Sequence, residues 1–329
     1  MEKILEVKDL HVTFKTYGGT VQAVRGVNFH LNKGETLAIV GESGCGKSVT
    51  ANAVMGLIPS PPGKITSGKI LFKGQDLTKL PEKKMRAIRG VDISMIFQDP
   101  MTALNPTLTI GTQLTEGVKQ HLKVSDKEAR KQALAMMNLV GIPNPEERLK
   151  QYPHQFSGGM RQRIVIAIAL ICEPELLIAD EPTTALDVTI QAQILELFEK
   201  IQEVTGVSII LITHDLGVVA KIADRIAVMY AGKIIETGTK REIFYKREHP
   251  YTKGLLHSVP RLDTKEKLMP IEGTPPDLFS PPRGCPFTVR CPFAMEVCNK
   301  VYPASTTLSN SHSVDCWLQD VRAKQLLET

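Results

Sequence analysis

The sequence lacks any long hydrophobic run. Its longest apolar stretch, IVIAIALIC at 164–172, and the nearby LLIA at 176–179 are far shorter than the ~20 residues that a membrane-spanning helix needs. The first ten residues, MEKILEVKDL, contain neither the apolar core nor the small-residue cleavage site of a secretory signal. We therefore expect a cytosolic protein, unless another component carries it to a membrane.

The sequence also lacks a large excess of one charge. Its 40 Lys and Arg residues against 35 Asp and Glu give a net charge of +5, which is compatible with a negatively charged partner but ordinary for a soluble protein. A hydrophobic fraction of 42% over 329 residues suffices for one large domain, or for a large domain and a small one.

Cysteines are few, but four of the six gather near the C-terminus, spaced C-x5-C-x6-C-x17-C. This spacing has neither the close pairs of zinc sites nor the short gaps of ferredoxin-type iron–sulfur runs, although four thiolates suit either centre. A reducing cytosol disfavours a disulfide staple. A metal site and unliganded buried thiols both remain open for these four residues: Cys285, Cys291, Cys298 and Cys316.

The stretch ETLAIVGESGCGKSVTANAVMGLI predicts a buried strand, a glycine-rich turn and a helix. Gly41, Gly46, Lys47 and Ser48 fit the pattern G-x-x-x-x-G-K-S. Glycines allow backbone N–H groups to surround phosphate oxygens, the lysine supplies charge to the β- and γ-phosphates, and the serine offers a hydroxyl to Mg²⁺. The pattern predicts a phosphate-binding loop.

A second apolar run, ELLIADEPTTALD, predicts a buried parallel strand that ends in two acids. Asp180 is placed to hold Mg²⁺ through its water shell, and Glu181 is a natural general base for a water that attacks the γ-phosphate. Alone, such a pair is often a helix cap or a solvated turn. The phosphate-binding loop upstream favours the catalytic interpretation.

Two further segments carry candidate polar groups. In QFSGGMRQRIVIAIAL, Ser157 is expected to cap a helix whose first turn contains two glycines, and such a helix end attracts anions. VSIILITHD predicts a strand that places His214 at its end. Taken alone, the histidine is as readily structural as functional.

Together these segments closely resemble the ATPase subunit of an ABC transporter over about residues 1–250. Residues 41–48 match its Walker A loop, 176–181 its Walker B strand with the catalytic glutamate, and FSGGMRQR its signature. Gln98 in IFQDP matches the Q-loop, residues 185–187 the D-loop and His214 the switch histidine. Met160 stands where many relatives have Gln, and Cys45 where Ser is common.

The resemblance implies that ATP lies between the Walker A loop of one subunit and the signature helix of a second. Ser157, Gly158 and Gly159 would then contact the nucleotide held by the partner. Tyr17 would stack on adenine, with Phe14 as the alternative, although both are also plausible core or loop residues. The resemblance further implies three catalytic residues, Gln98, Glu181 and His214; Mg²⁺ ligands Ser48 and Gln98; and nucleotide contacts by Gly41, Ser43, Gly44, Cys45, Gly46, Lys47, Ser48, Val49 and Asp180.

The fold expected is α/β: a P-loop NTPase (RecA-like) parallel sheet with an ABC-type antiparallel β subdomain, a helical subdomain and a small loop-rich C-terminal extension. We place the nucleotide-binding domain at 1–258, its helical subdomain at about 99–165, and the extension at 259–329. Local signals agree, because Ser125 and Glu128 form a capping-box pattern and Asp187 can cap a helix that Gly206 ends.

Two stretches, DPMTALNPTLTIG after Gln98 and REHPYTKGLLHSVP at 247–260, are similar to the dipeptide/oligopeptide permease branch. That resemblance implies ATP, Mg²⁺ and a structural [4Fe-4S] cluster at the four cysteines. It also implies a peripheral place on the cytoplasmic face of the membrane. The expected partners are a second ABC ATPase subunit, identical or different, two transmembrane permease subunits and an extracytoplasmic peptide-binding protein.

Two alternative functions follow from related proteins: import of another cargo, and ATP hydrolysis coupled to nucleic acid. Related importers move oligosaccharides, nickel or antimicrobial peptides, and other subunits bind the cargo. Soluble ABC ATPases that act on nucleic acid usually have two cassettes, zinc knuckles or long basic arms, and this chain has one cassette and neither of the other features. We therefore expect no nucleic-acid partner.

Overall fold

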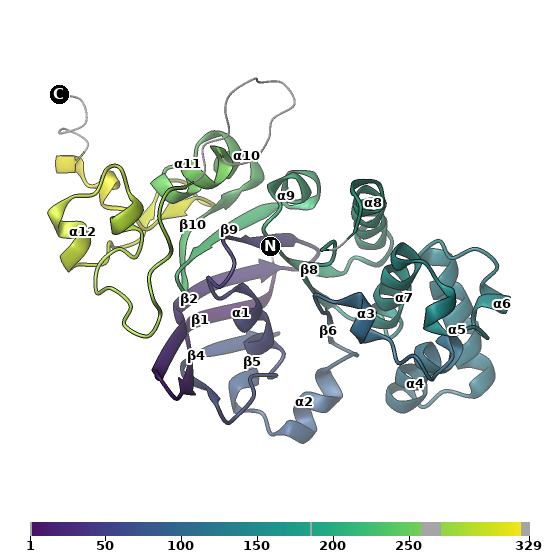
Figure 1. The fold of residues 1–329 in the computed structure, drawn as a ribbon. Helices are drawn as coiled ribbons and strands as arrows, with labels where there is room; N and C mark the ends of the chain where they lie inside the picture. Colours follow the sequence, from purple (N-terminus) through teal and green to yellow (C-terminus); the bar gives the residue numbers. More distant parts are fainter. Residues whose placement is uncertain (1, 185, 258–270, 324–329) are drawn as a thin grey trace. The chain divides into compact units, whose positions relative to one another are not determined.

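The computed structural model describes residues 2–184, 186–257 and 271–323, which form two compact units (Figure 1). Unit one comprises Met1–Ile4, Leu31–Thr36 and Lys79–Ile212, and unit two comprises Leu5–His30, Leu37–Thr78 and Thr213–Thr329. Each unit is assembled from separate stretches of chain. The predicted boundary between residues 258 and 259 lies outside the described residues and stays a prediction.

Unit one contains three parallel strands, β6 (Ile93–Ile96), β7 (Leu176–Asp180) and β8 (Ser208–Thr213). β7 lies in the middle, with Ala179 opposite Ile96 on one side and Leu211 on the other. All five residues of β7 are buried, which explains its uninterrupted apolar sequence. Neighbouring parallel strands bring their C-terminal ends to one edge, where polar residues follow.

Helices make up most of the remainder of unit one, and Figure 1 shows α3 to α7 gathered together. Ser125 caps α5 and Asp187 caps α8, each through a side-chain oxygen that accepts a backbone N–H, and Gly206 ends α8 with a φ of 70°. These caps confirm the predicted helix ends. The helices are α2 (Glu82–Ile88), α3 (Pro100–Ala103), α4 (Ile110–Leu122), α5 (Asp126–Leu139), α6 (Pro145–Arg148), α7 (Gly158–Leu170) and α8 (Val188–Thr205), with a 3-10 turn at Pro153–Gln155.

Two sheets organise unit two. The first has the order β2-β1-β4-β5, with β1 antiparallel to β4 and β4 antiparallel to β5. The second has the order β11-β12-β10-β9-β3, in which β3 and β9 are parallel and β10 is antiparallel to β9 and to β12. The strands are β1 (Lys3–Thr16), β2 (Gly19–Asn32), β3 (Thr36–Val40), β4 (Gly63–Phe72), β5 (Gln75–Asp76), β9 (Arg225–Tyr230), β10 (Lys233–Thr239), β11 (Thr306–Thr307) and β12 (Ser313–Val314).

The helices of unit two are short and surround an apolar core to which the C-terminal segment, residues 271–323, contributes Phe287. Among the described ranges no helix is both long and apolar enough to cross a membrane. The mixed sheets and helices confirm the predicted α/β class. The helices are α1 (Lys47–Val54), α9 (Leu216–Ile222), α10 (Lys240–Tyr245), α11 (Pro250–His257) and α12 (Glu296–Lys300), with 3-10 turns at Leu77–Lys79, Thr288–Arg290 and Trp317–Gln319.

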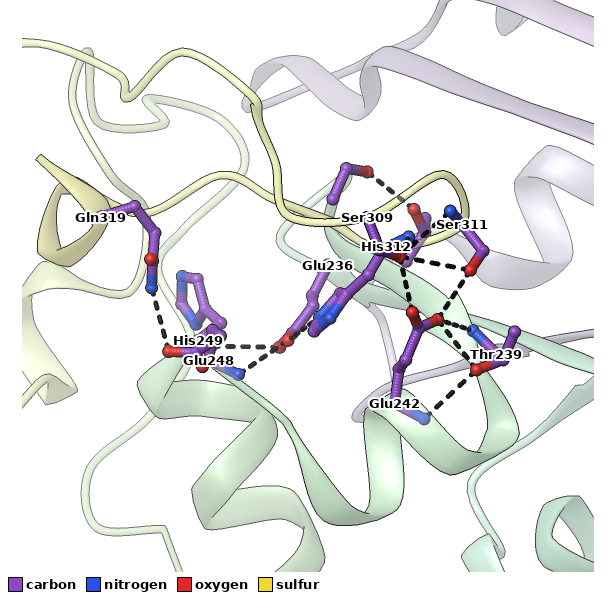
Figure 2. A network of polar contacts seen from close by, with 11 residues as sticks. Glu236, Thr239, Glu242, Glu248, His249, Ser309, Ser311, His312 and Gln319 are labelled. Carbon is purple, nitrogen blue, oxygen red and sulfur yellow. Dashed lines mark hydrogen bonds and ion pairs between the residues drawn. The ribbon is translucent and has the colours of Figure 1, made fainter.

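A polar network fixes the C-terminal segment to β10 (Figure 2). The Glu236 side chain on β10 is fully buried, and its Oε1 lies 2.9 Å from Nε2 of His312 and accepts the Glu248 N–H at 2.8 Å. Its Oε2 accepts the His249 N–H at 3.1 Å. Because a buried carboxylate is costly without donors, the contact from His312 ties the segment to the sheet, and the N–H groups of Glu248 and His249 satisfy the rest of the carboxylate.

Glu242 on α10 forms the second centre of this network. It accepts hydrogen bonds from the hydroxyls of Ser309 at 2.6 Å, Ser311 at 2.9 Å and Thr239 at 2.8 Å. Burial alone would raise the pKa of Glu242, but these bonds outweigh it and lower the pKa to about 2. The ionised carboxylate is therefore the form that the folded protein prefers.

We expect acid to weaken the hydrogen bonds to the Glu242 carboxylate over a defined pH range. A carboxyl whose folded pKa is about 2, against the ordinary value near 4.3, adds stability above pH ~4.3 that is lost as pH falls toward 2. We expect Glu242→Gln to lower the thermal midpoint at pH 7, and the difference from wild type to shrink as pH falls from 5 to 3. Differential scanning fluorimetry measures it, with the exposed Glu296→Gln as control. A difference that stays constant with pH would refute the linkage.

Candidate nucleotide-binding site

The loop between β3 and α1, residues 41–46, is shaped by glycines. A Cβ on Gly41 would lie 2.1 Å from the carbonyl oxygen of Met229, and one on Gly46 would lie 2.5 Å from that of Ala23. Gly46 caps α1 with a φ of 107°, in the left-handed region. Only glycine fits at these two places, so the chain can turn tightly and present its backbone at the start of α1.

Lys47 lies inside this loop rather than in solvent. Its side chain is buried, and Nζ donates to the carbonyl oxygens of Gly41 at 2.7 Å and Glu42 at 3.0 Å. The first turn of α1 contains no acidic residue, so the positive end of the helix dipole and the ammonium both favour an anion here. This donor set fits a phosphate group, and we call residues 41–48 the P-loop.

The P-loop cysteine contributes little beyond its backbone. Cys45 is buried, and burial raises the pKa of its thiol, an effect that the nearby Lys47 partly reverses. Ser43 and Gly44 are exposed, and Ser48 and Val49 are partly buried at the start of α1.

In unit one, the structure brings Gln98 and Glu181 together. Each follows the C-terminal end of a strand, β6 and β7 respectively, and Nε2 of Gln98 donates to Oε2 of Glu181 at 3.0 Å. Thr184 Oγ1 donates to the same oxygen at 3.0 Å. Glu181 has a φ of 49°, a left-handed conformation that is uncommon for a residue with a side chain and is typical of functional sites. The preceding Asp180 is buried.

The predicted anion-binding helix end is formed by α7. Ser157 caps it, with Oγ accepting the Met160 N–H at 3.3 Å. A Cβ on Gly158 would meet nothing within 4 Å, so this end of the helix has room for a ligand. A Cβ on Gly159 would lie 2.9 Å from Ile190, so a larger residue there would disturb the packing of α7 on α8.

Two residues near Glu181 escaped the sequence-based prediction. Gln162 on α7 is fully buried and donates to the carbonyl oxygen of Pro182 at 2.6 Å, which links the signature helix to the residue after Glu181. Thr184 contacts Glu181 directly, because its hydroxyl donates to the Glu181 carboxylate. A glutamine within an otherwise apolar helix was the available signal for Gln162. Nothing local distinguished Thr184 from any other turn residue.

Three of the remaining predicted residues lie in unit two. Tyr17, in the turn between β1 and β2, is fully exposed, and Phe14 is partly buried near Gly63. His214 directly follows β8 and is exposed. Ala185, the first residue of the predicted D-loop, lies outside the described residues. The adenine contact and the catalytic role of His214 stay predictions.

The prediction of an iron–sulfur cluster is wrong on this structure. Cys285, Cys291, Cys298 and Cys316 do line one cavity, but its volume is about 20 Å³, roughly the space of one water molecule. Burial raises the pKa of Cys285 to about 11 and that of Cys316 to about 12, as expected of thiols in an apolar space. Within residues 2–184, 186–257 and 271–323, no group of three or more His, Cys, Asp or Glu is placed to hold a metal ion.

The physical reason is the apolar lining of this cavity, which includes Phe287, Phe293 and Trp317. All six cysteines are free thiols. Cys298 is buried and the other three cysteines are partly buried. In this small apolar space they behave as small hydrophobic residues, and the predicted metal-binding extension is corrected accordingly.

Comparisons with known proteins identify the class of protein to which the chain belongs. The family model described as ABC transporter matches residues 24–184, which contain the P-loop, Gln98 and Glu181. The structure is similar to the dimeric post-hydrolysis state of the ATP-binding cassette MJ0796 bound to ADP and Pi, with a TM-score of 0.64 and 28% identity over 72% of this chain and 99% of that one. The molecule is an ATP-binding cassette with the P-loop NTPase fold.

The branch of the ABC transporter family is identified by a second family model, which matches the C-terminal part of the chain, and by relatives that match over nearly its full length. The model of the oligopeptide/dipeptide transporter C-terminal region matches residues 235–298. The dipeptide transport ATP-binding protein DppD of Bacillus subtilis is 71% identical over 98% of this chain and 97% of its own length. The oligopeptide transport protein OppD of the same species is 61% identical over 96% and 89%. The chain therefore belongs to the ATPase subunits of dipeptide and oligopeptide ABC transporters.

Proposed function

We propose that the chain hydrolyses ATP to power the import of di- and oligopeptides through separate membrane subunits. One observation carries the proposal: a dipeptide transport ATP-binding protein matches at 71% identity across 98% of the chain. Such coverage includes both the cassette and the C-terminal segment. ATP and Mg²⁺ are the cofactors expected of this class.

The residues have distinct proposed roles. Lys47 and the P-loop backbone bind the β- and γ-phosphates, because the loop supplies buried positive charge and a helix N-terminus. Glu181 accepts the proton of the attacking water, and Gln98 orients its carboxylate through the 3.0 Å hydrogen bond. Asp180 and His214 are the further residues that the resemblance to ABC ATPases assigns to nucleotide binding and to catalysis. When bound, Mg²⁺ neutralises phosphate charge, and Ser48 with Gln98 would hold it.

The partners proposed are those of a complete importer: a second ATPase subunit, identical or different, two transmembrane permease subunits and an extracytoplasmic peptide-binding protein. The exposed N-terminal end of α7 supports the pairing, because it forms an anion site separate from the P-loop's own helix end. The similar cassette MJ0796 is a dimer bound to ADP and Pi. We place the chain on the cytoplasmic face of the membrane, held there by its partners.

A signature-helix mutation tests the pairing when it is combined with a P-loop mutation. In a mixed dimer, Lys47→Ala and Ser157→Arg placed in the same subunit should disable both ATP sites. The same two changes divided between the subunits should disable one site and leave the other intact. ATPase assays on affinity-purified mixed dimers compare the two arrangements. Equal activity in both would contradict nucleotide binding across the dimer.

The cargo is tested by transport. Cells that carry Glu181→Gln in place of the wild-type chain should lose uptake of labelled di- and tripeptides. Their uptake of nickel and of labelled oligosaccharides should be unchanged. A loss confined to nickel, to an oligosaccharide or to an antimicrobial peptide would replace peptides by that cargo, while leaving the ATPase role in place.

A further inference from the structure

The P-loop contains an acidic residue that the C-terminal segment holds. Glu42, between Gly41 and Ser43, forms a two-pronged ion pair with Arg290. The Arg290 Nη1–Glu42 Oε2 distance is 2.7 Å, and the Nη2–Oε1 distance is 2.9 Å. Such paired contacts fix both charge and orientation. The two residues lie 248 positions apart in the sequence, so the last part of the chain touches the phosphate-binding loop directly.

Arg290 is itself held rigidly. Its side chain is 4% exposed, and its other N–H groups donate to the carbonyl oxygens of Glu272 at 2.9 Å and Ile271 at 3.0 Å. The guanidinium carbon lies 5.8 Å from the centre of the Tyr230 ring and 5.9 Å from that of Phe287, within the range of cation–π attraction. A buried arginine with all these contacts has a fixed position, and it therefore fixes the carboxylate of Glu42 that it binds.

The backbone of Glu42 is fixed on both sides as well. Its N–H donates to the hydroxyl of Tyr251 at 2.9 Å, and its carbonyl oxygen accepts from Lys47. Tyr251, on α11, is fully buried and packs 4.5 Å from Tyr230, measured between ring centres. The amide, the carbonyl and the carboxylate of this one P-loop residue are therefore all engaged, two of them by residues beyond position 250.

Electrostatics gives the contact a consequence for nucleotide binding. A carboxylate in a phosphate-binding loop repels the phosphates, and the repulsion is strong where water is partly excluded. Arg290 cancels the charge of Glu42 and draws its carboxylate toward the aromatic cluster of Tyr230, Tyr251 and Phe287. Without Arg290, the carboxylate would remain as an uncompensated negative charge beside Lys47.

We propose that Arg290 is a positioning residue for ATP, through which the C-terminal segment holds the P-loop open to phosphate and neutralises Glu42. The proposal rests on the proposed function, since it assumes that the P-loop binds nucleotide. It gives the C-terminal segment a direct part in setting ATP affinity. The polar network at Glu236 anchors the same segment at a second place (Figure 2).

The test is a double-mutant cycle that removes the charges of Arg290 and Glu42 singly and together. It measures how tightly a fluorescent ATP analogue binds to the purified chain. Arg290→Gln should weaken binding about 10-fold, and Arg290→Lys, which keeps the charge but not the paired geometry, about threefold. Glu42→Gln should bind as tightly as wild type or more tightly. The double variant should return to within about twofold of wild type, because neither charge remains.

Steady-state kinetics adds a second readout. We expect Arg290→Gln to raise KM for ATP and leave kcat nearly unchanged, since Glu181 and Gln98 are untouched. The exposed Arg322→Gln, another arginine of the C-terminal segment paired with an acid, is the matched control. Thermal unfolding without nucleotide verifies that each variant folds, and Arg290→Lys carries the test should Arg290→Gln fail to fold.

Two results would overturn the proposal. One is unchanged affinity in a folded Arg290→Gln, or in Arg290→Lys where the glutamine variant does not fold. The other is a double variant as weak as Arg290→Gln, which would make the contact purely structural. Lys47→Ala, measured alongside, separates these results from failure of the nucleotide site. If Lys47→Ala also binds normally, the P-loop assignment falls and the inference falls with it.

Discussion

Glu181→Gln is expected to bind ATP normally and to hydrolyse it about 10²–10⁴-fold more slowly, the usual contribution of a general base. Glutamine keeps the size of the side chain and an oxygen that accepts from Gln98 or Thr184, which both donate to Oε2 at 3.0 Å in the wild type. It has no basic group to take a proton from water. Phosphate release under saturating ATP measures the loss.

The control for this experiment is Glu203→Gln, an exposed glutamate on α8. Its turnover should match wild type. ATP should raise the thermal midpoint of Glu181→Gln by at least as much as it raises that of wild type, because bound nucleotide is no longer consumed. Turnover above one tenth of wild type would remove Glu181 as the base and direct attention to another proton acceptor.

Lys47→Ala is expected to lose ATP affinity by roughly 30-fold or more, as removal of a buried charged partner typically costs about 2–5 kcal/mol. The ammonium has two roles that alanine cannot replace: it supplies positive charge, and it ties the carbonyl oxygens of Gly41 and Glu42 together. Isothermal titration with a non-hydrolysed ATP analogue measures the affinity.

Lys69→Ala, at an exposed position on β4, is the matched lysine control and should bind as wild type does. The unfolding midpoint of Lys47→Ala without nucleotide shows whether the P-loop itself has collapsed. A folded Lys47→Ala that binds ATP at wild-type strength would contradict the assignment of the phosphate site.

The features predicted correctly from sequence are those encoded by neighbouring residues. Asp187 caps α8 and Gly206 ends it, because capping depends on contacts within a few positions. The apolar run Leu176–Ala179, which predicted a buried parallel strand, lies in β7, and all five residues of that strand are buried. At Ser125 half of the predicted capping box is observed. The Ser125 side chain accepts the Glu128 N–H, which is one of the two hydrogen bonds of a capping box.

The features that sequence could not predict are contacts over long distances. Nothing local indicates that Arg290 pairs with Glu42, or that Gln162 reaches Pro182, because both contacts depend on how separate elements pack. The iron–sulfur prediction failed for the same reason. It rested on a resemblance to a family and not on the surroundings of the four thiols, which line an apolar cavity of about 20 Å³.

The pairing of β12 with β10 means that the cassette cannot be trimmed to a minimal ATPase. A chain that stops after residue 257 would leave β10 as an exposed edge strand, a template for aggregation. It would also remove His312 from the buried Glu236, whose carboxylate would keep only the N–H groups of Glu248 and His249 as donors. Truncation should therefore yield poorly soluble protein.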